Sequence, residues 1–122
     1  MATFMQDYPP LLGSIEMAVS HVRKIVAVHQ PARVDDAEAI VRALMGDALT
    51  RTGPNENISM ITMADPGRIR FEVHDPNTSV PGAYPDPDAH RIASARADRY
   101  GSRRTRDGHM YWAELHGQGA HP

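Results

Sequence analysis

Cysteine is absent from this chain of 122 residues. That absence excludes disulfide scaffolds, thiolate zinc sites and cysteine nucleophiles. No apolar run approaches the roughly 20 residues that a membrane-spanning helix needs. Residues 1–10 contain Asp7 but no cationic stretch of the kind that opens a secretory signal. We therefore expect a soluble cytoplasmic protein that has no membrane partner.

A strong excess of charge of either sign is also missing. The chain has 13 basic and 15 acidic residues, which gives a formal net charge of −2. Because a general nucleic-acid binder needs a basic face, we expect no direct contact with nucleic acid. Hydrophobic residues make up 41% of the chain, which suffices for the core of one domain of this length.

Two stretches in the first half have the apolar periodicity of helices. From Ser14, which is placed to act as an N-cap, apolar side chains recur every three or four positions to about His29. The same spacing runs from a cap at Asp35 or Asp36 to Arg51, before the break at residues 52–55. The sequence therefore predicts two helices, preceded by an extended segment at residues 1–12.

The second half has the alternation typical of strands. Residues 58–63 are apolar, and residues 68–74 alternate between apolar and polar side chains. Asp88 is placed to cap a third helix that runs to about Arg99, and residues 110–115 form a last strand after a turn at Asp107-Gly108. This order predicts an α+β two-layer sandwich, with a mixed, mainly antiparallel sheet and about three helices on one face. The other face is expected to meet solvent or a partner.

Neither histidines nor methionines point to a cofactor. The seven histidines form no His-x-His or His-x-x-x-His pair, so we expect surface histidines and no metal site. Four methionines lie mostly on apolar stripes and are expected to fill the core: Met17, Met45, Met60 and Met63.

Five landmarks in order carry a family resemblance: Gly13-Ser14-Ile15, the run Val34 to Val41, the strand Arg70 to Pro76, the run Ala95 to Gly101, and Asp107-Gly108 followed by Tyr111 to Leu115. With these landmarks, the chain resembles the histidine-kinase-like ATPase domains of the small anti-sigma-factor serine kinases. Such stand-alone domains are abundant in high-GC Gram-positive bacteria. The resemblance implies an ATPase-like domain over residues 13–117 and a flexible tail over residues 118–122.

The resemblance also implies where an active site would lie. In such domains the second helix carries a Glu that orients or deprotonates the attacking group, and four residues later an Asn that holds magnesium. Here Ala43 stands at the Glu position, where it has no acid–base chemistry, and Asp47 stands at the Asn position. Asp47 is either a magnesium ligand or a solvated helix residue.

Nucleotide recognition is only partly retained in the sequence. Asp75 stands at the family's adenine-binding aspartate, or else it begins a turn with Pro76. The family's Gly-x-Gly phosphate cradle is replaced by Pro87, Asp88 and Ala89; proline has no amide donor, and the added carboxylate repels phosphate. We therefore expect no cofactor, or at most weak binding of ATP and magnesium.

The leading interpretation is a catalytically inactive regulatory protein that binds a sigma factor, an anti-sigma antagonist or a transcription regulator. Two alternatives stay open: a divergent ATP-dependent anti-sigma serine kinase, and a structural subunit paired with another ATPase-like domain. A homodimer is the expected association, since symmetric dimers are the commonest oligomers. One basic patch is the candidate partner surface, or else a solvated loop: Arg99, Arg103, Arg104 and Arg106.

Overall fold

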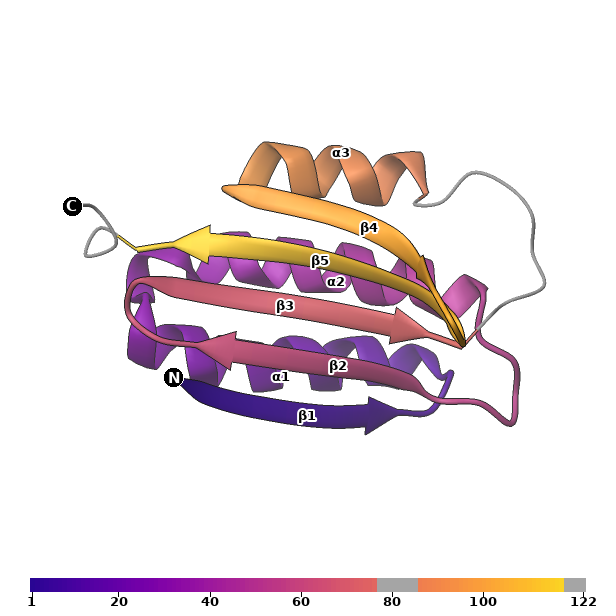
Figure 1. Cartoon of the computed structure of the whole chain (residues 1–122). Coiled ribbons are helices and arrows are strands. Elements are labelled where there is room, and N and C mark those ends of the chain that lie inside the picture. The colour runs from indigo at the N-terminus through magenta and orange to yellow at the C-terminus, as the bar shows by residue number, and fades with distance from the viewer. Residues whose placement is uncertain (77–85, 118–122) are drawn as a thin grey trace.

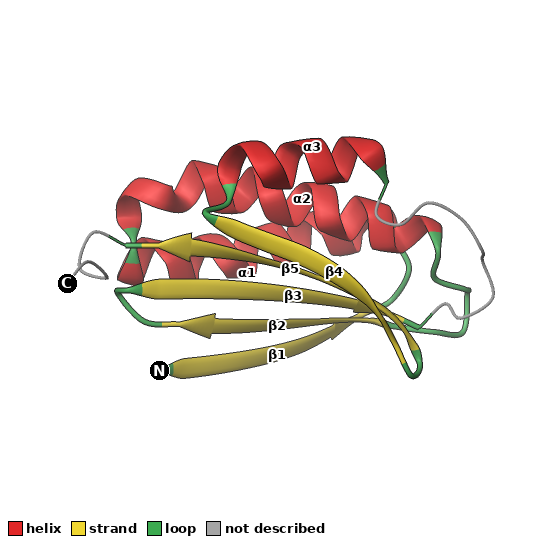
Figure 2. Cartoon of the chain, turned by 45° about the horizontal axis from the view of Figure 1, so that its top comes forward, coloured by secondary structure: helices red, strands yellow, loops and turns green. Residues whose placement is uncertain are grey.

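Strands and helices form two layers in the computed structural model, which describes residues 1–76 and 86–117. The strands are β1 (Ala2–Tyr8), β2 (Ile58–Ala64), β3 (Arg68–Asp75), β4 (Arg99–Thr105) and β5 (Gly108–His116). They form one sheet in the order β1-β2-β3-β5-β4. The helices α1 (Leu12–His29), α2 (Val34–Thr50) and α3 (Pro87–Arg96) cover one face of that sheet (Figure 1 and Figure 2).

The predicted fold class, an α+β two-layer sandwich, is confirmed. All strand pairs within the described ranges are antiparallel, so the mainly antiparallel sheet has no parallel pair in this part of the chain. None of the helices described is both long enough and apolar enough to cross a membrane. The predicted tail, residues 118–122, lies outside the described residues.

The core lies between the sheet and the helices. On β3, Ile69, Phe71 and Val73 are buried against the helices, as the alternation of that strand predicts. The apolar positions of α2 recur at steps of three and four and are buried together: Ala37, Ile40, Val41, Leu44, Met45 and Ala48. Each large side chain buried in this way contributes about 1.5–3 kcal/mol to folding.

Three predicted details of α1 and α2 are wrong. Ser14 lies inside the first turn of α1 and does not cap it; its hydroxyl donates to the carbonyl oxygen of Pro9 at 2.7 Å. Asp35 and Asp36 lie in the first turn of α2, where the helix dipole favours acidic residues, and neither is the cap. Met17 was expected in the core but is 65% exposed.

Two strands were not predicted. β1 occupies most of the N-terminal segment that was expected only to be extended, and β4 begins at Arg99, where the third helix was expected to end. β4 forms because it pairs with β5 across a tight turn at Arg106 and Asp107. Both strands lie at the edges of the sheet, and β4 buries none of its residues, so neither needs an apolar alternation.

Candidate functional site

Two carboxylates that the sequence indicated as candidate site residues, Asp47 and Asp75, bind the same arginine at the end of α2. The Arg51 guanidinium donates a hydrogen bond of 2.7 Å to each carboxylate oxygen of Asp47. It also donates two hydrogen bonds, of 3.1 and 3.2 Å, to Oδ2 of Asp75. The side chain of Asp75 is fully buried, and those of Asp47 and Arg51 are only 4% and 11% exposed. The structure therefore brings the predicted pair together around an internal cation.

Local structure explains how these three residues converge. Asp47 lies in the last turn of α2, and Arg51, four residues later, is its C-cap residue, so both side chains lie on one face. A cation at this end of the helix also suits the helix dipole. Asp75 is the last residue of β3, on the sheet face that turns toward the helices. The ends of α2 and β3 lie near each other in Figure 1.

Within this cluster one guanidinium binds two buried carboxylates. Burial alone would lower the pKa of the Arg51 guanidinium, but hydrogen bonds and charges from Asp47 and then Asp75 outweigh the burial and raise that pKa. Two parallel hydrogen bonds between arginine and a carboxylate are among the strongest that side chains form. Arg51 therefore supplies the positive charge that these buried carboxylates need. The sequence indicated this residue only as the last cation of a helix.

β5 covers Asp75 from the neighbouring strand. His109 pairs with Asp75 across the β3–β5 register, and its Nδ1 lies 3.6 Å from Oδ1 of Asp75. At Gly108 a Cβ atom would lie only 1.8 Å from the backbone oxygen of Asp75, so no side chain fits there. His109 is buried, which corrects the prediction of a surface histidine. The only sequence feature that marked this part of β5 was the predicted turn at Asp107-Gly108.

A cavity of about 280 Å³ lies between α2 and the start of α3. Its lining includes Ala43, Asp47 and Asp88, three of the positions to which the resemblance assigns a nucleotide site. Ala43 offers this cavity no acid–base group. Asp86 adds another carboxylate, and Arg42 contributes one positive charge, so the charge that lines the cavity is mainly negative.

The first amides of α3 already have an acceptor. Asp86 caps the helix, and its carboxylate accepts hydrogen bonds from the amide nitrogens of Asp88 at 3.0 Å and Ala89 at 3.3 Å. The predicted cap, Asp88, instead pairs with Arg91 at 3.3 Å. Because a helix N-terminus binds phosphate through those amides, a phosphate here would have to displace a carboxylate.

These residues do not fit a magnesium-bound triphosphate in this conformation. Asp47 and Asp75 are bound to Arg51, and Asp86 occupies the helix amides. Across residues 1–76 and 86–117, no group of three or more His, Asp or Glu side chains could hold a metal ion. A triphosphate would meet carboxylates where it needs donors.

The predicted basic patch lies on β4 and the turn that follows it. Arg99 and Arg103 are on the open face of the sheet, Arg104 is on the helix side, and Arg106 is in the turn. All four side chains are exposed, and none forms an ion pair with an acidic residue in the described ranges. The sheet thus has a cationic edge, although the whole chain has a net charge of −2.

Trp112 lies on the open face of the sheet, on β5. The guanidinium carbon of Arg70 lies 4.3 Å from its ring centroid, and that of Arg99 lies at 5.9 Å, which are cation–π distances. Gly101 lies opposite Trp112 on β4, and a Cβ there would come within 2.8 Å of the indole Nε1. The missing side chain at Gly101 therefore makes room for the indole ring.

Two carboxylates on the open face stay ionised through their partners. Arg70 donates to Glu72 and to Glu114, each at 2.9 Å, and His116 lies 3.0 Å from Glu114. For both glutamates, burial would raise the pKa, but the hydrogen bonds and nearby positive charges outweigh it and lower the pKa. Around Trp112, the open face of β3 and β5 therefore carries a network of paired charges.

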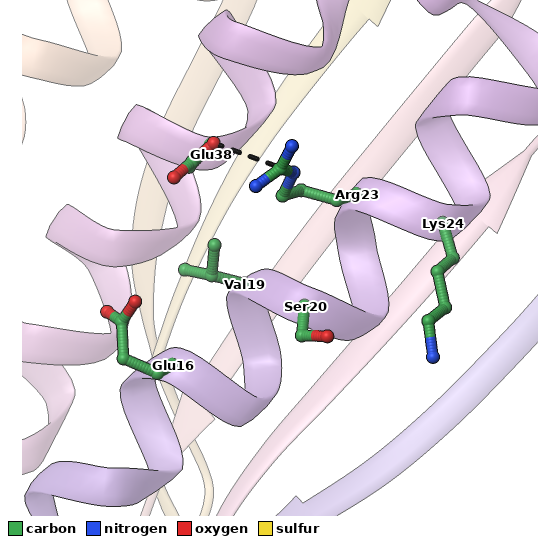
Figure 3. Close-up of a pocket in the computed structure, with 6 residues that line it drawn as sticks. All are labelled: Glu16, Val19, Ser20, Arg23, Lys24 and Glu38. Carbon is green, nitrogen blue, oxygen red and sulfur yellow. Dashed lines mark ion pairs between the residues drawn. The ribbon is translucent and has the colours of Figure 1, made fainter.

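A second cavity, of about 320 Å³, lies along α1 beside α2 (Figure 3). Figure 3 shows Arg23 of α1 directed toward Glu38 of α2, and the pair lies at 3.8 Å. Arg42 of α2 also joins the two helices through Glu16 of α1 at 2.8 Å, and within α2 it pairs with Glu38 at 3.3 Å. These contacts pair the helices with each other, so we assign this cavity to helix packing.

No model of a known protein family matches the sequence, and no curated protein sequence matches it. The function proposed below therefore depends on the geometry of the site and on the resemblance of residues 13–117.

Proposed function

We propose that the chain is a catalytically inactive ATPase-like domain that acts as a regulatory binding protein, in transcriptional or developmental control in the cytoplasm. The observation that carries the proposal is the pairing of Arg51 with both Asp47 and Asp75. In the family that this chain resembles, those two positions serve magnesium and adenine. Here one internal guanidinium binds both carboxylates. Ala43, at the position of the family's base, has no acid–base chemistry.

The charge of the cavity supports the loss of nucleotide binding. Asp86 and Asp88 lie at the start of α3, where a phosphate would need amide donors. Two like charges about 4 Å apart repel by about 4 kcal/mol at the dielectric typical of a protein surface. A triphosphate would meet this repulsion without gaining the helix amides, which Asp86 already occupies.

The expected partner carries an acidic segment. Arg103, Arg104 and Arg106 are exposed and have no ion-pair partner in the described ranges. The first two lie on the edge strand β4, and Arg106 lies in the turn that follows it. An edge strand can accept an extended segment of another protein through its backbone, while unpaired arginines select acidic side chains. As the resemblance implies, that protein is a sigma factor, an anti-sigma antagonist or a transcription regulator.

Calorimetric titration of the full chain with the purified sigma factor or antagonist encoded nearest to it tests this binding. We expect saturable binding that weakens as salt rises. The double variant Arg103→Glu with Arg104→Glu should weaken it by about tenfold or more, which corresponds to about 1.4 kcal/mol. The matched control is Arg91→Glu on the exposed side of α3, which should bind as the wild type does.

Absence of binding, or binding that the double variant leaves unchanged, would contradict the proposed surface. The rival function, a divergent serine kinase, is tested in the same mixtures with ATP and magnesium. Phosphate transferred to a serine of the antagonist would favour that rival.

A further inference from the structure

The edge strand β4 has a gap in its row of side chains on the open face of the sheet. Arg99, Gly101 and Arg103 alternate along that face, and Gly101 contributes no side chain. The two arginines are about 13 Å apart along the strand, with the glycine midway between them. No strand in the described ranges pairs with the outer side of β4, and none of its residues is buried (Figure 1). A residue of an added strand opposite Gly101 would therefore meet no side chain of β4.

The indole ring of Trp112 borders this gap. A Cβ at Gly101 would lie 2.8 Å from the indole Nε1 and 2.9 Å from both Cε2 and Cζ2, so the nitrogen edge of the ring lies beside the glycine. Trp112 is half-buried, and no described residue accepts a hydrogen bond from its N–H. Indole N–H groups usually have an acceptor where they are shielded from water. The gap therefore offers a donor that a bound partner can satisfy.

Positive charge exceeds negative charge beside the gap. Glu72 and Glu114 lie on the same face of the sheet, but Arg70 binds both of them, each at 2.9 Å. Arg99 and Arg103 form no ion pair within the described ranges. Two such cations on either side of one N–H donor favour an anion with acceptor oxygens, which a carboxylate supplies.

We propose that β4 binds an extended segment of the partner protein with an aspartate or glutamate directly opposite Gly101. We call this side chain of the partner the anchor carboxylate. It accepts a hydrogen bond from the indole N–H of Trp112 and lies between Arg99 and Arg103. This inference rests on the proposed function, because it assigns a position to one residue of the acidic segment proposed there.

An antiparallel arrangement gives the anchor carboxylate these neighbours. Every strand pair within the described ranges is antiparallel, and the added strand continues that pattern. In such a pair, Cβ atoms directly opposite each other are about 4.5–5.5 Å apart, and diagonal neighbours two residues along are about 7–8 Å apart. Arg99 and Arg103 are the diagonal neighbours of a residue opposite Gly101, and arginine side chains are long enough to reach it.

Two synthetic peptides that differ in one side chain test this assignment. Each is acetylated, amidated, as long as β4 and made of threonine and valine, with glutamate at the centre of one and glutamine at the centre of the other. Glutamine keeps the shape and an acceptor oxygen but has no charge. Trp112 is the only tryptophan of the chain, so its emission reports binding at this place. We expect the glutamate peptide to bind with a Kd below about 1 millimolar, and about tenfold more tightly than the glutamine peptide.

Variants of the full chain separate the anchor contact from general attraction between charges. Trp112→Phe keeps an aromatic ring but removes the N–H, and Arg99→Gln removes one of the two neighbouring charges. In calorimetric titrations, each variant should lose most of the preference for glutamate over glutamine. The matched control is Arg104→Gln, which removes the same charge from the helix side of the same strand. This control should keep the preference of the wild type.

Equal affinity of the wild type for the two peptides would overturn the anchor carboxylate, as would a preference that Arg99→Gln and Arg104→Gln reduce alike. Absence of binding of the glutamate peptide up to about 1 millimolar would overturn it too. Arg99 lies on an exposed edge strand, so its variant stays informative if Trp112→Phe fails to fold. The proposed function fails by a different result, which is that the natural partner does not bind the chain.

Discussion

Arg51 and Asp75 are 24 residues apart in sequence, yet the guanidinium of one donates two hydrogen bonds to a single carboxylate oxygen of the other. Arg51 also donates a hydrogen bond to each carboxylate oxygen of Asp47, so one side chain connects the end of α2 to the end of β3. The resemblance places a nucleotide site at this junction. Here the two carboxylates stabilise the contact between the helix end and the strand end, whereas the family that the chain resembles uses these positions for ligand binding.

Arg51→Ala should destabilise the fold by about 3–5 kcal/mol, because it leaves two buried carboxylates without their cation. Unfolding in urea, followed by circular dichroism, measures the change. Arg51→Lys keeps a charge but not the two parallel hydrogen bonds, so it should fall between the alanine variant and the wild type.

The matched control for this prediction is Arg42→Ala. Its partners Glu16 and Glu38 lie on the helix surface, so its unfolding midpoint should stay close to that of the wild type. If Arg51→Ala were as stable as Arg42→Ala, the buried cluster would not hold α2 to β3.

Gly101→Ala should move the only tryptophan of the chain. The new Cβ would lie 2.8 Å from the indole Nε1 of Trp112, so the ring must leave its place beside Gly101, where Arg70 lies 4.3 Å from its centroid. We expect a shifted fluorescence emission and a loss of about 1–3 kcal/mol of stability, as is usual for overpacking.

Gly46→Ala provides the opposite case. Nothing lies within 4 Å of a Cβ at Gly46, and the residue sits inside α2. Alanine there should stabilise the helix by about 0.5–1 kcal/mol without changing the emission. An unshifted emission in Gly101→Ala would mean that the indole does not lie over this glycine.

Stability should fall in acid through the glutamates of the open face. The pKa of Glu114 lies below its ordinary value of 4.5, because hydrogen bonds from His116 and Arg70 outweigh the effect of burial. The unfolded chain therefore takes up a proton at higher pH than the folded chain does. The contribution of Glu114 to the free energy of unfolding is complete above pH 4.5 and is lost as the pH falls through the lowered pKa of Glu114. The pKa of Glu72 is also lowered, so it acts in the same direction.

Melting temperatures recorded from about pH 7 to about pH 3 test this dependence. Glu114→Gln should be less stable at neutral pH, because Arg70 loses a charged partner, and its melting temperature should fall less steeply in acid. A variant that follows the wild-type acid profile would assign the pH dependence to other carboxylates.

The segments that face the core on a regular period could be predicted from the sequence. α2 and β3 each bury one row of side chains. Apolar residues therefore recur every three or four positions in α2 and at every second position in β3. β1 and β4 are edge strands with little or no buried stripe, so their sequences carry no such period. Their existence depends on pairing with β2 and β5, which are distant in sequence or joined only by a turn.

The candidate site was predictable only in part, for the same physical reason. Asp47 and Asp75 could be found from their place in an ordered set of motifs. Arg51 was assigned only as the cation at the end of a helix, although its place four residues after Asp47 is the local signal for an ion pair. Its contact with Asp75 joins a helix end to a strand end, and no local spacing encodes that contact. His109 reaches the site through the register of β5 against β3.

Titration calorimetry of the wild-type chain with ATP and magnesium tests most directly whether this domain has lost its nucleotide site. If Asp75 alone still reads adenine, one charge-assisted hydrogen bond contributes roughly 1.5–3 kcal/mol, whereas micromolar affinity requires about 8 kcal/mol. We predict no saturable heat at ATP concentrations up to about 1 millimolar. A dissociation constant at or below about 10 micromolar would contradict the inactive assignment and favour a working kinase.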